Sequence, residues 1–109
     1  MAKSYKVLGQ SAPSATTATD VYTVPSATQA VISSVVIAER GGSAATFRIA
    51  VRPDGASLTD SQYIAYDTPI SANDVVALTL GMTVDATDVV TVYASSGDVT
   101  FSLFGSEIS

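Results

Sequence analysis

The sequence predicts an all-β protein, an antiparallel, jelly-roll-like β-sandwich of about eight strands. Apolar residues recur at a spacing of two along most of the chain, which is the period of a strand with one buried face. Short segments rich in Pro, Gly, Asp, Asn and Ser separate these runs, as turns between antiparallel strands do. No segment of useful length has helical spacing, so the crossover helices that a parallel sheet needs are missing.

Four strands are expected in the N-terminal half of the chain. The first three, Tyr5–Leu8, Asp20–Val24 and Gln29–Ala38, are rich in Val, Ile, Tyr and Thr, which fit a pleated surface. The fourth, Phe47–Val51, alternates Phe, Ile and Val with Arg and Ala. One of its faces is therefore apolar and suited to a core.

Four further strands are expected in the C-terminal half. Gln62–Tyr66 and Asp88–Ala94 have the same β-branched and aromatic composition, and Val76–Met82 and Val99–Leu103 alternate apolar with small or polar residues. A single helical turn is the most that could form near Ala56–Ser61. The turns that join the strands are expected at residues 25–28, 40–43, 53–55, 71–74, 85–88 and 95–98.

A chain of 109 residues is expected to form one domain around one core. Residues 1–19 are predicted to be an N-terminal arm with one short strand, and residues 20–109 the β-sandwich domain. The core contains few aromatic side chains and many small aliphatic ones, so a single copy is expected to be only marginally stable. The expected inward-facing residues are Val36, Phe47, Ile49, Val51, Tyr66, Val76, Leu78, Leu80, Val90, Val92, Val99, Phe101 and Leu103.

The strand Gln29–Ala38 has apolar residues on both of its faces. Such a strand is either central in its own fold or covered by a neighbouring chain. We favour a contact between subunits over burial within one chain. The residues expected to make that contact are Val31, Val35 and Ile37.

Charge is divided unevenly along the chain. All five cations precede residue 53, together with two acids, whereas the rest of the chain carries eight acids and no cation. Interleaved strands would mix these charges in space, which is the interpretation we favour. The other interpretation is a dipolar particle with one face suited to an acidic partner.

Two classes of partner are disfavoured by composition. A net charge of −5 with five cations cannot supply the Lys and Arg surface that nucleic acid binding requires. No apolar stretch approaches the ~20 residues that span a bilayer, and the first residues lack the apolar region of a secretory signal. We therefore expect no nucleic acid partner, no membrane partner and no export by that route.

The chain has no His, Cys or Trp, which removes most catalytic and metal chemistry. We expect no enzymatic activity, no cofactor and no metal. Two pairs of carboxylates, Asp85 with Asp88 and Asp60 with Asp67, are the weak candidates for a glycosidase, and the first also for calcium, but turns commonly use Asp to bind backbone. The tyrosines could form a platform for a carbohydrate, although strands use Tyr routinely at half-buried positions.

Several stretches of the chain carry a resemblance to known proteins. They are Tyr5–Gln10, Val21–Pro25, Ala45–Pro53, Tyr63–Asp67 and Asp88–Ala94. In these stretches the chain resembles small virion structural proteins of tailed bacteriophages, particularly those of aquatic bacteria. The resemblance spans nearly the whole chain but includes no site motif, so it assigns no functional residues. It implies a β-sandwich or jelly-roll domain that decorates or cements a capsid, or that forms part of the tail and its fibres.

The resulting expectation is a non-enzymatic capsid decoration or cement protein of the virion. It is expected to act as a homo-oligomer, a dimer or trimer, bound to the major capsid protein or other virion proteins. Lys3, Lys6 and the polar segment Ser11–Thr19 are expected to bridge to a neighbour, with Arg48 and Arg52 exposed nearby. The alternative is a tail, baseplate or fibre module that anchors or performs host attachment.

Overall fold

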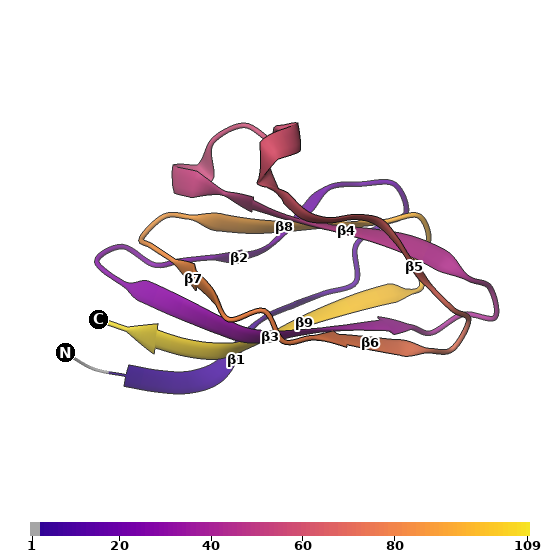
Figure 1. Ribbon diagram of the computed structural model, residues 1–109, viewed down its shortest axis with the longest axis horizontal. Helices are drawn as coiled ribbons and strands as arrows, with labels where there is room; N and C mark the ends of the chain where they lie inside the picture. The colour runs from indigo at the N-terminus through magenta and orange to yellow at the C-terminus, as the bar shows by residue number, and fades with distance from the viewer. Residues whose placement is uncertain (1–2) are drawn as a thin grey trace.

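Two antiparallel sheets packed face to face make up residues 3–109, the part of the chain that the computed structural model describes (Figure 1). The predicted all-β sandwich is confirmed. Its strands are β1 (Lys3–Ser11), β2 (Thr19–Thr23), β3 (Gln29–Glu39), β4 (Ala45–Arg52), β5 (Tyr63–Ile70), β6 (Val75–Leu78), β7 (Met82–Val84), β8 (Val89–Ala94) and β9 (Val99–Ile108). None of the described residues belongs to a helix that is long and apolar enough to cross a membrane.

The order of the strands is that of a jelly roll. One sheet has the order β1-β9-β3-β6, with β7 also paired to β3, and the other has the order β2-β8-β4-β5. The first strand thus pairs with the last, the second with the next to last, and so on inward to the β4–β5 pair. A single long hairpin that is rolled into two sheets gives this pairing.

The sandwich has nine strands because the expected strand Val76–Met82 is divided in two. Gly81 lies between β6 and β7 with a φ of +63°, a conformation that glycine adopts without steric cost. Both β6 and β7 pair with β3, so the chain stays in the same sheet on either side of the break. Two short 3-10 turns, Pro53–Gly55 and Asp60–Gln62, lie around the place where a helical turn was considered.

The N-terminal segment is longer and better integrated than an arm with one short strand. The strand β1 pairs with β9 from Lys3 to Ser11 and forms an edge of the five-stranded sheet. The connection that follows crosses to the other sheet, where Pro13 is buried and the Thr16 N–H donates a hydrogen bond to the carbonyl of Ala94. The segment Ser11–Thr19 therefore lies against its own sandwich.

A β-bulge in β3 changes which of its residues face the core. The pairing of β3 with β9 shifts register between Ile32 and Ser34, so one extra residue is accommodated and the side-chain alternation reverses there. Ile32, Val35 and Ile37 consequently all point between the sheets, and each is 0% exposed. The expectation that Val35 and Ile37 contact another subunit is wrong, because their own chain buries them.

The core lies between the two sheets and contains most of the expected residues. Phe47 of one sheet meets Phe101 of the other edge to face, with ring centroids 6.2 Å apart. Seven of the expected inward residues are fully buried: Phe47, Ile49, Val90, Val92, Val99, Phe101 and Leu103. Val51, Val76 and Leu78 pack partly buried against this cluster.

Three expected core residues lie outside it. Tyr66 is 55% exposed and Leu80 is 47% exposed. Val36 is half-buried and lies on the outer surface of its sheet, because the bulge reversed the alternation of β3. All three corrections have the same cause. Irregularities in the backbone shift the alternation of inward and outward side chains, and each assignment assumed an unbroken alternation.

Folding also mixes the charges of the two halves of the chain. Lys6 forms an ion pair with Glu107, with 2.6 Å between nitrogen and oxygen, and Arg48 forms one with Asp67 at the same distance. Each pair joins a cation of the first half to an acid of the second. The interpretation that interleaved strands mix the charge is therefore supported for these residues.

Candidate functional site

The outer face of the five-stranded sheet is almost free of charge. Strand register and burial place one set of side chains on this side, opposite the core. We call this set the outer face: Lys3, Tyr5, Val7, Gln10, Gln29, Val31, Ser34, Val36, Ala38, Val75, Ala77, Thr83, Thr100, Ser102, Phe104, Ser106 and Ile108. Lys3 is its only charged member. A large sheet face with exposed apolar side chains and almost no charge is typical of a contact surface.

Apolar side chains surround a shallow hollow of about 530 Å³ that extends from near the middle of the outer face toward Lys3. Tyr5 is 79% exposed and Val7 is 47% exposed, and Val31 and Phe104 line the same hollow. Val7 lies opposite Phe104 across the β1–β9 pair, and Tyr5 lies opposite Ser106. The small side chains between the large ones leave room for a side chain of a partner.

The backbone around this hollow is shaped by two β-bulges and a close approach of strands. The bulge in β1 shifts its register between Val7 and Gly9, and the bulge in β3 lets the Ser33 hydroxyl donate to the carbonyl of Phe104 at 3.1 Å. At Gly105, a Cβ atom would lie 1.9 Å from the carbonyl oxygen of Val31. Only glycine lets β3 and β9 approach this closely.

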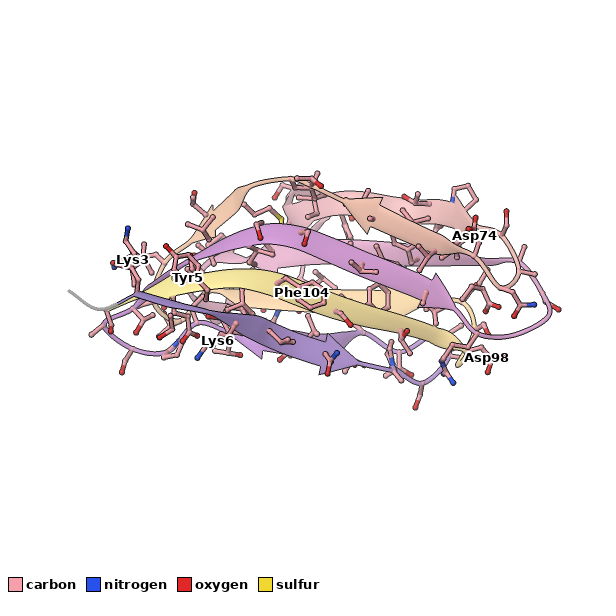
Figure 2. The ribbon with its side chains drawn as sticks, turned by 90° about the horizontal axis from the view of Figure 1, so that it is seen from below. Lys3, Tyr5, Lys6, Asp74, Asp98 and Phe104 are labelled. Atoms are coloured by element: carbon pink, nitrogen blue, oxygen red, sulfur yellow. The ribbon has the colours of Figure 1, made fainter. Side chains whose placement is uncertain are left out.

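The two ends of the outer face differ in charge (Figure 2). Lys3 and Lys6 lie at one end, and Asp74 and Asp98 lie at the other, with Phe104 between them. Among residues 3–109, neither aspartate nor Lys3 forms an ion pair. Arg40 lies beside these aspartates and donates to the carbonyl of Gly97 at 3.0 Å, so this end has two acids and one cation.

Lys6 belongs to a polar cluster between the sheets at the edge formed by β1 and β2. The Glu107 carboxylate accepts a hydrogen bond from the Tyr22 hydroxyl at 2.5 Å and pairs with Lys6. Hydrogen bonds from Lys6 and Tyr22 lower the pKa of Glu107. Burial and the neighbouring Glu107 carboxylate raise the pKa of Tyr22. The cluster closes the open edge of the sandwich and leaves Lys6 half-exposed.

The Glu107 cluster gives the protein a specific acid sensitivity. Because folding lowers the pKa of Glu107, its contribution is present above the unfolded value of ~4.3 and is lost as the pH falls through the lowered pKa. We expect Glu107→Gln to unfold more easily at pH 7 and to show a flatter decline in the free energy of unfolding between about pH 5 and 3. Urea titrations at several pH values measure this, and two parallel declines would contradict it.

The outer surface of the four-stranded sheet carries a different group, an arginine held between tyrosines. The Arg48 guanidinium lies 4.1 Å from the ring centre of Tyr66 and 4.2 Å from that of Tyr93. It also makes two hydrogen bonds to Asp67, and Tyr63 packs edge to face on Tyr66. Cation–π contacts on both sides fix the guanidinium in place.

Arg52 is similarly engaged within the chain. Its guanidinium forms an ion pair with Asp20 at 2.9 Å and donates to Thr91 and to the carbonyls of Gly55 and Ala56. Arg48 and Arg52 therefore hold the four-stranded sheet and its turns together. They lie on the opposite side of the sandwich from Lys3, so the structure does not bring the four expected partner-binding cations together.

Of the seven predicted contact residues, Lys3 and Val31 lie on the outer face and Lys6 lies at its edge, and their role in binding stays a prediction. Sequence reasoning missed Tyr5, Val7 and Phe104 as members of the same surface. The sequence contains one indication of this surface, which is Phe104. It alternates with the core residues of its strand and so lies on the same, polar side as Thr100 and Ser102. An aromatic residue on the polar side of a strand is a pointer to a contact.

Of the candidate carboxylates, Asp85 and Asp88 are occupied by turn contacts, and Asp67 is paired with Arg48. Asp88 accepts hydrogen bonds from the backbone N–H groups of Asp54 and Asp85, both at 2.8 Å. Asp85 accepts from Gln29 and from the N–H of Ala86, which lowers its pKa. Within the described part of the chain, no group of three or more acidic side chains is placed to hold a metal ion.

The uncharged outer face is thus the candidate functional site, and its chemistry is that of a contact between proteins. It combines exposed apolar side chains with small polar ones and is bounded by charges of opposite sign. Neither models of known protein families nor the sequences of curated proteins give a match to this chain.

Proposed function

We propose that this protein is a non-enzymatic structural protein of a tailed-bacteriophage virion that decorates or cements the capsid. The observation that carries the proposal is the outer face, a sheet surface with exposed Tyr5 and Val7 on its edge strand, Phe104 near its middle and one charged residue, Lys3. A cement protein needs a rigid fold with such a surface for neighbouring subunits. The resemblance to small phage virion proteins supports the same assignment.

The rest of the molecule suits a position on the outside of a crowded particle. Acids of the second half that form no ion pair, such as Asp54 and Asp60, are exposed. Exposed like charges keep particles from associating. The partner in this proposal is the major capsid protein or another virion protein, to which the protein binds as a homo-oligomer.

The location of the protein is tested by immunogold labelling of intact virions with an antibody raised against it. Label over the heads supports a decoration or cement function, and label confined to the tails favours the alternative below. Intact virions without label, from a lysate in which the same antibody detects the protein, would contradict any structural role in the particle.

The cement function is tested by the stability of heads. We expect heads assembled without this protein to release their DNA at a lower temperature than heads to which the purified protein is added back, because a bound protein stabilises the state that it binds. A dye that reports released DNA during heating measures the difference. Equal release temperatures would show that the protein decorates the head without cementing it.

The second candidate function is host attachment as a tail, baseplate or fibre module. It is favoured by Tyr63, Tyr66 and Asp60, which line a shallow hollow of about 480 Å³ on the other sheet. Aromatic rings with polar neighbours are suited to ligands with both apolar and polar faces, such as sugars. Binding of purified host surface polysaccharide that is lost in Tyr63→Ala and kept in Tyr5→Ala would support it.

A further inference from the structure

The outer face has the charge pattern of a self-complementary surface. One end carries Lys3, with half-exposed Lys6 beside it, and the other end carries Asp74 and Asp98 (Figure 2). The surface between these ends is uncharged and has Phe104 near its middle. A second copy placed against this face in the reverse direction would meet each charged end with its opposite.

We propose that two copies of this chain associate through their outer faces, with the strands of one copy running opposite to those of the other across a two-fold axis near Phe104. In this arrangement Lys3 of one copy faces Asp74 and Asp98 of the second copy. Val7 and Phe104 of the two copies meet near the axis, and Tyr5 of each copy packs on the uncharged surface of the other copy beyond its Phe104. The inference deepens the proposed function and rests on it for its biological role.

Charge selects this axis over the alternative one. A two-fold axis that runs along the strands would also stack the two faces, but it would place Lys3 against Lys3 and the aspartates against aspartates. Like charges facing one another across an interface are unfavourable, and opposite charges fix the register of a complex. The isologous contact with reversed ends is therefore the favoured one.

The size of the face fits a stable dimer. The face spans the longest and the shortest dimensions of the molecule, 45 and 19 Å. That area is comparable to the ~800 Å² per partner that specific interfaces bury. Phe104 near the middle, with charge confined to the ends, matches the usual division of an interface into an apolar middle and a polar rim.

Association through the edges of the sheet is less suitable. The free edge strand β1 contains a β-bulge after Val7 and two lysines, and both features prevent a second strand from pairing there. The opposite edge is formed by two short strands, β6 with four residues and β7 with three. The edges are therefore protected while the face is open.

The experiment is sedimentation equilibrium of the purified full chain at micromolar concentrations, compared with two surface variants. We expect the wild type to have twice the mass of the 11.1 kDa chain and Tyr5→Ser/Phe104→Ser to be monomeric. The matched control, Leu58→Ser/Ile64→Ser, changes two exposed apolar residues outside the outer face and is expected to remain a dimer. A monomeric wild type, a trimer, or a dimer that Tyr5→Ser/Phe104→Ser leaves intact would overturn the proposal.

Charge reversal tests the direction of the contact without altering the apolar centre. Lys3→Glu makes both ends acidic, and Asp74→Lys/Asp98→Lys makes both ends basic, so each variant alone is expected to dimerise at least ten-fold more weakly at low salt. Mixing the two variants is expected to restore dimers, and salt is expected to weaken the wild-type dimer. A wild-type dimer that salt strengthens would overturn the reversed arrangement. These measurements use the isolated chain, so they test the dimer independently of the proposed function. A monomeric chain could still be found on virions by labelling, and a dimeric chain could be absent from them.

Discussion

Gly105→Ala is expected to lower the free energy of unfolding by about 3 kcal/mol or more, or to prevent folding. A Cβ atom at this position would lie 1.9 Å from the Val31 carbonyl oxygen and 2.9 Å from its carbonyl carbon. These are backbone atoms, so no side-chain rotation can relieve the overlap. The strands β3 and β9 would have to separate where they pair at the centre of the five-stranded sheet.

A control for this prediction is Gly42→Ala. A Cβ atom at Gly42 would meet nothing within 4 Å, and surface changes of this kind usually shift stability by less than ~0.5 kcal/mol. Urea unfolding followed by circular dichroism compares the two variants with the wild type. Equal stabilities of Gly105→Ala and Gly42→Ala would show that β3 and β9 do not approach each other as closely as described.

The requirement for glycine at this position also bears on the interface. Gly105 lies beside Phe104 and Ser106 and lines the hollow that Tyr5 and Val7 border. The same close approach of strands therefore holds the sheet together and shapes its outer face. A substitution at Gly105 would therefore change the stability of the fold and the shape of the outer face together.

The regular parts of the fold were predictable from the sequence because alternation and turn chemistry are local. Phe47, Ile49 and Val51 needed only their own spacing to indicate a strand with one buried face. The irregular parts were not predictable in this way. The bulge near Ser33 depends on the pairing of β3 with β9, and a local pattern contains no information about a partner strand that is some 70 positions away.

The candidate site was predictable only in part for the same reason. Val31 was assigned to the surface correctly, but Val35 was assigned with it because the two share parity in the sequence. After the bulge they point to opposite sides, and Val35 is fully buried. The ion pairs of Lys6 and Arg48 likewise join residues that are brought together only by the fold. The sequence shows how many cations there are, but not which acids they contact.

Glu39→Met is expected to raise the free energy of unfolding by about 1–3 kcal/mol. Glu39 ends β3 on the side that faces the core and is only 3% exposed. Neither of its carboxylate oxygens has a hydrogen-bond partner among the described residues. A buried polar group without partners opposes folding, and methionine fills a similar volume without one.

Two comparisons separate the cost of the buried carboxyl group from other effects. Glu39→Gln keeps a polar group of the same shape, so it is expected to gain less than Glu39→Met. The backbone contact from the Glu39 N–H to the Asp74 carbonyl at 2.9 Å remains in both variants, so the acidic end of the outer face keeps its geometry and the dimer is expected to persist. A loss of stability in Glu39→Met would mean that an interaction of the carboxylate outweighs its burial. An unchanged stability in both variants would mean that the site admits water, because only solvation removes the cost of an unpartnered oxygen.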